Sequence, residues 1–228
     1  MKQRIELLDF WRSLCLLIMI AFHLCYDLAL FGVISMDVMT SLLAKLIAWD
    51  VGGCFVFISG ICVRFSHDPL RRGFVVFCAG TVVTLVTALL GMPVAFGILQ
   101  LLGICMMLYV PLKGYLETHI GLPFVLVNFA LFLTTWLLTA RVTVVVKLLY
   151  PLGLHTADFF SADYWPLLPW MFVFLIGTFF GKKLEENRDN PLWTLHFPAW
   201  MTYPGRHSLI VYLLHQPLLY GACWLLFR

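Results

Sequence analysis

The sequence has little charge: only 12% of its 228 residues are Asp, Glu, Lys or Arg, whereas 62% are hydrophobic. A soluble domain usually carries about a quarter charged residues to cover its surface. The formal net charge is only +3, and the basic residues are spread over short segments between apolar runs, which argues against a nucleic-acid-binding surface. The mean hydropathy of +0.94 therefore indicates an integral membrane protein.

Patterned cysteines and a cleavable leader are also lacking. None of the seven cysteines forms a C-x-x-C pair and almost all lie inside apolar segments, so we expect small buried side chains and neither a metal site nor a disulfide framework. The basic start MKQRIELLDFWRSL is not followed by a small-x-small cleavage site, and His23 and Asp27 interrupt the apolar stretch. We expect a retained first helix and, without repeats, a single domain over residues 1–228.

The apolar runs are long and do not alternate, which predicts helices rather than barrel strands. The sequence thus predicts an all-α membrane bundle with seven transmembrane helices, at 7–31, 41–65, 73–91, 93–112, 122–140, 165–182 and 206–227. The third and fourth are separated only by GMP, which predicts a tight turn. We expect residues 141–164 to form an outer loop or a partly embedded one, since Lys147, Pro151 and Gly153 make an eighth span poor.

The basic residues predict the orientation of these seven spans. With the N-terminus in the cytoplasm, eleven of the fifteen fall on the inner side and four on the outer side, which matches the positive-inside rule. The inner set is Lys2, Arg4, Arg12, Arg64, Arg71, Arg72, Lys113, Lys182, Lys183, Arg188 and Arg206, and the outer set is Lys45, Arg141, Lys147 and Arg228. We therefore expect a cytoplasmic N-terminus and a C-terminus outside.

Ionisable residues inside a span are costly and indicate function unless they are paired or lie at an end. Arg12 and His23 are eleven residues apart, which places them within about 20° on one helix face and about 16 Å apart along the axis. Arg12 would lie near the cytoplasmic headgroups, either paired with Asp9 or available to a ligand, and His23 about 12 Å below the outer end. His23 could also be a hydrogen-bonded core histidine.

Other polar side chains lie at comparable depths on other spans. Asp27 follows His23 by one turn and could orient its imidazole, or lie at the interface as a simple carboxylate. Asp50, about 15 Å deep, needs a partner, for which His23 and Lys45 are the candidates. Gln100, His215 and Gln216 add polar groups from the fourth and seventh helices. Together these side chains could converge on one cavity.

Several segments, in order, resemble one family. RIELLDFWRSLCLLIMIAFHLCYDL is similar to the first helix of bacterial relatives of the heparan-α-glucosaminide N-acetyltransferase catalytic domain, and so are FVFISGICVRFS, FGILQLLGICMML, DYWPLLPWMFVFLIGTFFGK and GRHSLIVYLLHQPLL. The Arg12, ten residues, His23 arrangement also resembles the first-helix signature of the wider transmembrane acyltransferase superfamily. The resemblance implies transfer of an acetyl or other acyl group from cytoplasmic acyl-CoA to a hydroxyl or amine, usually on a sugar, across the membrane.

The resemblance also suggests roles for particular residues. His23 would act as the general base or carry the acyl group itself, with Asp27 and Asp50 as further catalytic candidates. Arg12 and Arg64, helped by Arg71 and Arg72, would hold the anionic groups of CoA. Gln100, His215 and Gln216 complete the expected donor-binding set. We expect a multi-pass protein of a bacterial inner membrane with no metal; the acceptor, the acyl group and a homodimeric state stay open.

Two other functions compete with acyl transfer. A proton-coupled transporter of a small solute or lipid intermediate would use Asp50 and His23 as a proton relay. A haem protein would use His23 and His215 as axial ligands, which we disfavour because their estimated depths differ by about 8 Å.

Overall fold

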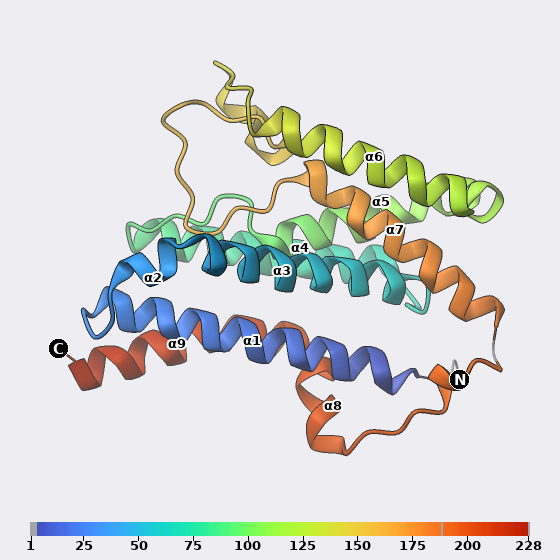
Figure 1. Cartoon of the computed structure of the whole chain (residues 1–228), viewed down its shortest axis with the longest axis horizontal. Helices are drawn as coiled ribbons and strands as arrows, with labels where there is room; N and C mark the ends of the chain where they lie inside the picture. The colour runs from blue at the N-terminus through green and yellow to red at the C-terminus, as the bar shows by residue number, and fades with distance from the viewer. Residues whose placement is uncertain (1–3, 188, 228) are drawn as a thin grey trace. The chain divides into compact units, whose positions relative to one another are not determined.

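The computed structural model describes residues 4–187 and 189–227, and helices dominate this part of the chain. Seven helices of the described residues are long and apolar enough to cross a membrane, which confirms the predicted all-α fold (Figure 1). They are α1 (Glu6–Leu30), α3 (Leu42–Val63), α4 (Pro69–Leu89), α5 (Ile98–His119), α6 (Leu122–Thr139), α7 (Leu167–Glu186) and α9 (Ser208–Phe227).

Shorter helical pieces join these spans. Two of them, α2 (Met36–Thr40) and α8 (Ala199–Arg206), were not predicted, because both are too short to show a membrane-length apolar run. The segment predicted as an outer loop contains the 3₁₀ helix η1 (Lys147–Leu152), and a second one, η2 (Pro191–Trp193), follows α7. Val145 and Leu148 in this loop are exposed.

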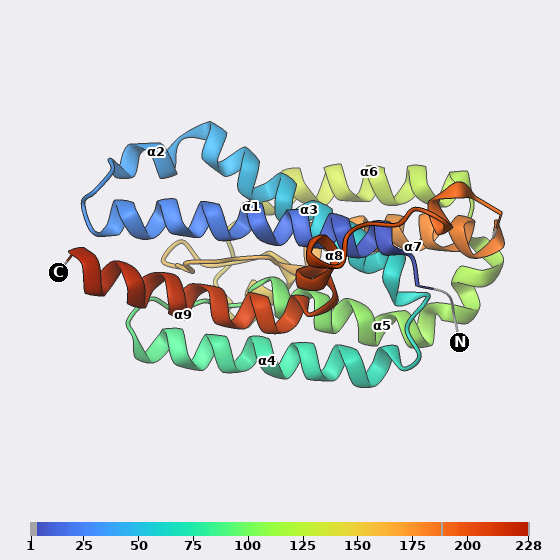
Figure 2. The same ribbon diagram turned by 90° about the horizontal axis from the view of Figure 1, so that it is seen from below.

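The chain divides into two compact units, residues 1–55 with 188–228, and residues 56–187. In the first unit α1 and α9 lie side by side and run in the same direction, and α8 packs against the beginning of α1 (Figures 1 and 2). Gly205 of α8 makes this approach possible, because a Cβ atom there would overlap the carbonyl oxygen of Asp9. Successive spans cross a membrane in alternating directions, so the first and the last of seven spans must run in the same direction, as α1 and α9 do.

In the second unit α4 packs against α5, and α6 against α7, as antiparallel pairs (Figures 1 and 2). The last two turns of α3, within this unit, contact α7 where two glycines meet. A Cβ atom on Gly60 would overlap the carbonyl oxygen of Phe174, and one on Gly177 that of Phe57. Small residues of this kind let membrane helices approach each other closely.

Both boundaries of the predicted fourth span are wrong, by five residues at its start and by seven at its end, where α5 continues to His119. The fourth span begins at Ile98 and not at residue 93, so a longer connection replaces the expected tight turn at GMP. Pro93 cannot donate a backbone hydrogen bond, and Phe96 has a φ of 61°, in the left-handed region that helices do not use. The connection is instead held by the outer loop, since the amide of Trp165 donates to the Phe96 carbonyl at 3.0 Å.

The ends of the second unit separate the basic residues as predicted. Arg71 begins α4, and Lys182 and Lys183 end α7, at the end where α5 also finishes, whereas Arg141 follows α6 at the opposite end. Lys2, Arg188 and Arg228, which the charge count includes, lie outside the described residues. The cytoplasmic N-terminus stays a prediction.

Candidate functional site

Polar side chains of α1 and α9 meet in the first unit. The Gln216 Nε2 atom donates to Asp27 Oδ1 at 2.9 Å, and Asp27 is completely buried. The sequence left open whether Asp27 orients His23 or lies at the interface as a simple carboxylate. Its burial excludes the second, and its hydrogen bond among the described residues goes to Gln216 and not to His23. The pairing joins residues from the first and last spans, so it fixes the register of α1 against α9.

His23 and His215 are in direct contact. Their ring centroids are 4.9 Å apart and the rings stand at 79° to each other. The estimated depth difference of 8 Å is therefore wrong, because it took the two helix ends as level. Phe31 at the end of α1 packs against Tyr220, so α9 continues for about two turns beyond it.

The contact also leaves no space for the haem alternative, since the axial ligands of a haem lie on opposite faces of a porphyrin that would separate the two rings. Among the described residues, no group of three or more His, Cys, Asp or Glu side chains could hold a metal ion.

Backbone carbonyls determine which nitrogen of each ring carries the proton. His23 Nδ1 lies 2.9 Å from the Met19 carbonyl oxygen, and His215 Nδ1 lies within hydrogen-bond distance of the Tyr212 carbonyl oxygen. A carbonyl oxygen only accepts, so in the neutral rings Nδ1 is the donor and Nε2 keeps a lone pair. His215 is 8% exposed, whereas His23 is half-buried. His23 is therefore the accessible base of the pair.

Arg12 lies three turns before His23 on the same helix, about 16 Å along the axis. The side chain is buried, and its Nε atom has no hydrogen-bond partner. Of the two possibilities left open by the sequence, the pair between Arg12 and Asp9 is not formed among the described residues. A guanidinium buried without a carboxylate can receive an anionic group such as a phosphate.

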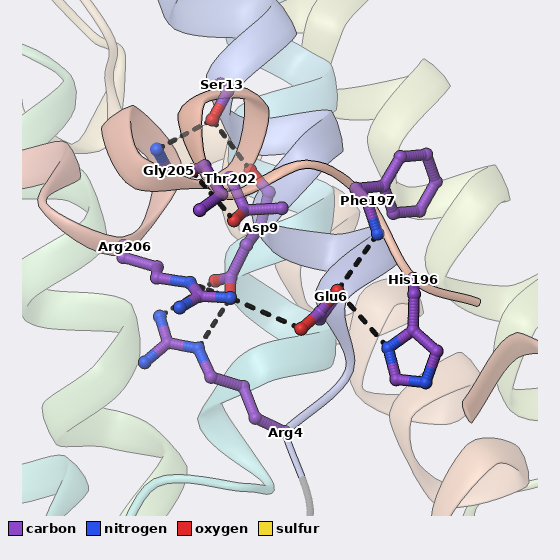
Figure 3. A network of polar contacts seen from close by, with 10 residues as sticks. Arg4, Glu6, Asp9, Ser13, His196, Phe197, Thr202, Gly205 and Arg206 are labelled. Atoms are coloured by element: carbon purple, nitrogen blue, oxygen red, sulfur yellow. Dashed lines mark hydrogen bonds and ion pairs between the residues drawn. The ribbon is translucent and has the colours of Figure 1, made fainter. Parts of the chain in front are cut away.

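Asp9 has other partners, in a polar network that joins the beginning of α1 to α8 and the segment before it (Figure 3). Both Asp9 carboxylate oxygens accept from Arg4, and Arg206 Nε lies 3.6 Å from Oδ2. Glu6 accepts from the Phe197 amide at 3.0 Å and lies 3.4 Å from Arg206.

The same network fixes the backbone of α8. Ser13 Oγ donates to the Asp9 carbonyl at 3.0 Å and accepts from the Gly205 amide at 2.8 Å. These contacts connect α8 to the α1 turns on either side of Arg12. They were not predicted, because nothing in the sequence indicates that residues about 190 positions apart lie together. The only signal is that DFWRS and GRHS both belong to the segments that carry the family resemblance.

Asp50 does not have the predicted partners. It is exposed, and no contact joins it to His23 or Lys45 among the described residues. Its electrostatic neighbours are instead the thiols of Cys15 and Cys54. The proton relay from Asp50 to His23, on which the transporter hypothesis depends, is therefore not assembled in this unit.

Gln100 belongs to the second unit and serves the beginning of α5. Its Oε1 atom accepts from the Gly97 amide at 2.8 Å and from Thr84 Oγ1 at 3.4 Å. A side chain that bonds the amide of the N-cap residue satisfies one of the unpaired donors at a helix start. The predicted donor-binding role of Gln100 gains no support from these contacts.

Arg64, also in the second unit, is held by carboxylates. Its Nη2 atom lies 2.9 Å from Glu117 and 3.0 Å from Glu185, and the side chain is only 3% exposed. These contacts join the ends of α3, α5 and α7. A phosphate would have to compete with two carboxylates for this guanidinium, so the geometry favours a structural role for Arg64 over the predicted one.

Asn128 on α6 is a buried polar residue that was not predicted. It is 5% exposed, and its Nδ2 atom donates to the Phe124 carbonyl of its own helix at 2.8 Å. This bond satisfies the amide locally, so Asn128 needs no functional explanation.

Comparison with known proteins supports one family. A family model described as heparan-alpha-glucosaminide N-acetyltransferase, catalytic, matches residues 4–217. No curated protein and no solved structure matches significantly. Members of the family are membrane acetyltransferases with acetyl-CoA as the donor. Because the match covers nearly the whole chain and includes both units, this chain belongs to the heparan-alpha-glucosaminide N-acetyltransferase catalytic-domain family.

Proposed function

We propose that the chain transfers an acetyl or other acyl group from cytoplasmic acyl-CoA to a hydroxyl or amine of a saccharide-type acceptor on the other side of the membrane. The family match supports acetyl transfer, and its extent supports one domain over residues 1–228. The structural observation that carries the proposal is the pair formed by an accessible His23 and a buried Arg12 with an unpartnered Nε atom on one face of α1.

His23 has the geometry of a general base. Its Nδ1 proton is bound to the Met19 carbonyl, so the Nε2 lone pair can take the proton of the acceptor. The acceptor oxygen or nitrogen then bonds to the acyl carbon, the carbon–sulfur bond of the thioester breaks, and the proton on Nε2 passes to the leaving thiolate.

A second course uses the same atom as the nucleophile. Nε2 of His23 would attack the thioester carbon, the carbon–sulfur bond would break to release the CoA thiolate, and an acyl-imidazole would form. The acceptor would then take the acyl group from Nε2, and the proton that it gives up would balance the thiolate as CoA thiol. Both courses need a neutral ring and the same tautomer.

Arg12 would bind a phosphate of CoA at the predicted cytoplasmic end of α1. The donor would extend along the helix, with its phosphate at Arg12 and its thioester about 16 Å away at His23. A charge-assisted hydrogen bond from Nε would satisfy the donor that lacks a partner. The polar network around Asp9 supports this assignment, because it engages that carboxylate and leaves Arg12 without a counter-charge.

The neighbouring polar residues of α1 and α9 complete the proposed site. We propose that Asp27 and Gln216 act together beside His23, and that His215, whose ring contacts His23, belongs to the same site. The contacts of Gln100, Arg64 and Asp50 do not add to the proposal. The orientation, the bacterial inner membrane as the location and a homodimer rest on the sequence alone.

The experiment is an assay of CoA release from acetyl-CoA by the full chain in proteoliposomes, with and without D-glucosamine as the acceptor. His23→Gln should lower kcat by about 100-fold or more, as expected for the loss of a general base or nucleophile. His67→Gln is the matched control, because His67 is exposed in the second unit and should leave the rate unchanged. Full turnover by His23→Gln would remove the proposed role of His23.

A further inference from the structure

Three buried polar atoms next to His23 lack hydrogen-bond partners. They are Asp27 Oδ2, Gln216 Oε1 and His215 Nε2. Asp27 is 0% exposed and His215 is 8% exposed, so these groups cannot turn toward bulk water. Buried polar groups in folded proteins are nearly always paired, and unpaired ones need an explanation.

All three atoms are hydrogen-bond acceptors. A carboxylate oxygen only accepts, and Gln216 uses its amide nitrogen on Asp27 Oδ1, which leaves its oxygen as the free end. His215 uses its Nδ1 proton on the Tyr212 carbonyl, which leaves the lone pair on Nε2. The site therefore has acceptors on both helices and lacks donors, which is the complement of a ligand with several N–H or O–H groups.

These acceptors lie around the proposed base. Asp27 follows His23 by one turn of α1, about 6 Å along the axis, and the His215 ring contacts the His23 ring. A ligand that gives its reacting hydroxyl or amine to His23 would have its neighbouring donors within reach of the three acceptors.

We propose that Asp27, Gln216 and His215 form the subsite that recognises the acceptor through donor groups adjacent to the one that is acylated. This inference rests on the proposed function, in which His23 contacts the reacting group. The subsite selects acceptors with neighbouring donors, such as a 1,2-amino alcohol or a 1,2-diol, over a simple amine or alcohol. Asp27 and Gln216 fix each other in place, so both helices contribute to specificity.

The test measures binding separately from turnover. The full chain, labelled with ¹⁵N-histidine and reconstituted in bilayers, is titrated with D-glucosamine and, as the matched probe, with cyclohexylamine, an amine on a six-membered ring without hydroxyl groups. The His215 Nε2 resonance, assigned by its absence in His215→Gln, should move upfield with D-glucosamine as the atom accepts a hydrogen bond. Cyclohexylamine should leave it in place.

Variants then test the partners. Asp27→Asn keeps the acceptor for Gln216 but puts an NH₂ group in place of Oδ2, so the Kd for D-glucosamine should rise about tenfold or more. Asp37→Asn, at an exposed aspartate on α2, should not change the Kd. Gln216→Met, which lacks both amide atoms, should also raise the Kd for D-glucosamine. It replaces Asp27→Asn as the test if Asp27→Asn does not fold.

The outcomes separate the subsite from the chemistry. No shift with D-glucosamine, an equal shift with cyclohexylamine, or an unchanged Kd in Asp27→Asn would overturn the subsite. A shift without any CoA release from acetyl-CoA would overturn the proposed acyl transfer and leave the subsite as a binding site. CoA release without a shift would support the proposed acyl transfer and overturn the subsite.

Discussion

Replacement of Arg64 by leucine distinguishes a structural ion pair from a phosphate ligand. Arg64 donates to Glu117 at 2.9 and 3.1 Å and to Glu185 at 3.0 and 3.3 Å, and its own side chain is 3% exposed. A fully buried ion pair that loses one partner costs about 3–5 kcal/mol. The side chains of Glu117 and Glu185 are 40% and 31% exposed, so both carboxylates can turn toward solvent after the change. We therefore expect a loss of about 2 kcal/mol.

The assay is the free energy of unfolding from an SDS titration in mixed micelles, together with the KM for acetyl-CoA. Arg64→Leu should lower the free energy of unfolding and leave KM unchanged. Lys113→Leu removes an exposed cation one turn before Glu117 on α5 and should change the free energy by less than about 0.5 kcal/mol. If Arg64→Leu kept its stability but raised KM about tenfold, the ion-pair account would be wrong and Arg64 would be a CoA ligand.

Three further changes test other contacts. Gly205→Ala would place a Cβ atom against the backbone of α1 and should lower the free energy of unfolding by about 1–3 kcal/mol. Gly221→Ala on α9 should not lower it, because no atom lies within 4 Å of the added Cβ; equal effects of the two variants would contradict the close approach of α8 to α1. Gln100→Leu removes the bond to the Gly97 amide and should cost about 1 kcal/mol in the same titration; no loss would show that this cap is unimportant. Burial and the neighbouring tyrosine raise the pKa of Tyr164 to about 12, so its contribution to stability is complete below pH of about 10 and is lost as the pH rises through 12. Absorbance titration of Tyr164→Phe should lack one phenol that titrates near pH 12 in the unmodified chain; loss of a phenol near pH 10 would contradict this.

Much of the fold is predictable because the bilayer imposes one length on every span. Each of the seven predicted spans corresponds to a helix, and most ends agree within a few residues. The largest errors are at the two ends of α5. Hydropathy extends through Pro93 and cannot register the left-handed Phe96, and the apolar run stops before Lys113 although the helix continues to His119. Hydropathy also missed α8, which is held against α1 by the close approach of Gly205 and by the polar contacts of Gly205 and Arg206.

The candidate site was predictable in composition but not in pairing. The spacing of Arg12 and His23 follows from one helix, so their common face could be calculated from the sequence. Which residue of α9 lies beside which residue of α1 depends on the offset between the two helices, and their ends gave the wrong offset. The contact between His23 and His215, and the bond from Gln216 to Asp27, therefore required the structure.

The central claim is that an acyl group moves from acyl-CoA on one side of the membrane to an acceptor on the other. Sealed proteoliposomes that enclose D-glucosamine, with radiolabelled acetyl-CoA added only outside, test this most directly. We expect the label to collect in enclosed acetylated amino sugar with the unmodified chain and with His67→Gln, and not with His23→Gln. Labelled product only outside, none at all, or the same yield with His23→Gln would contradict the claim.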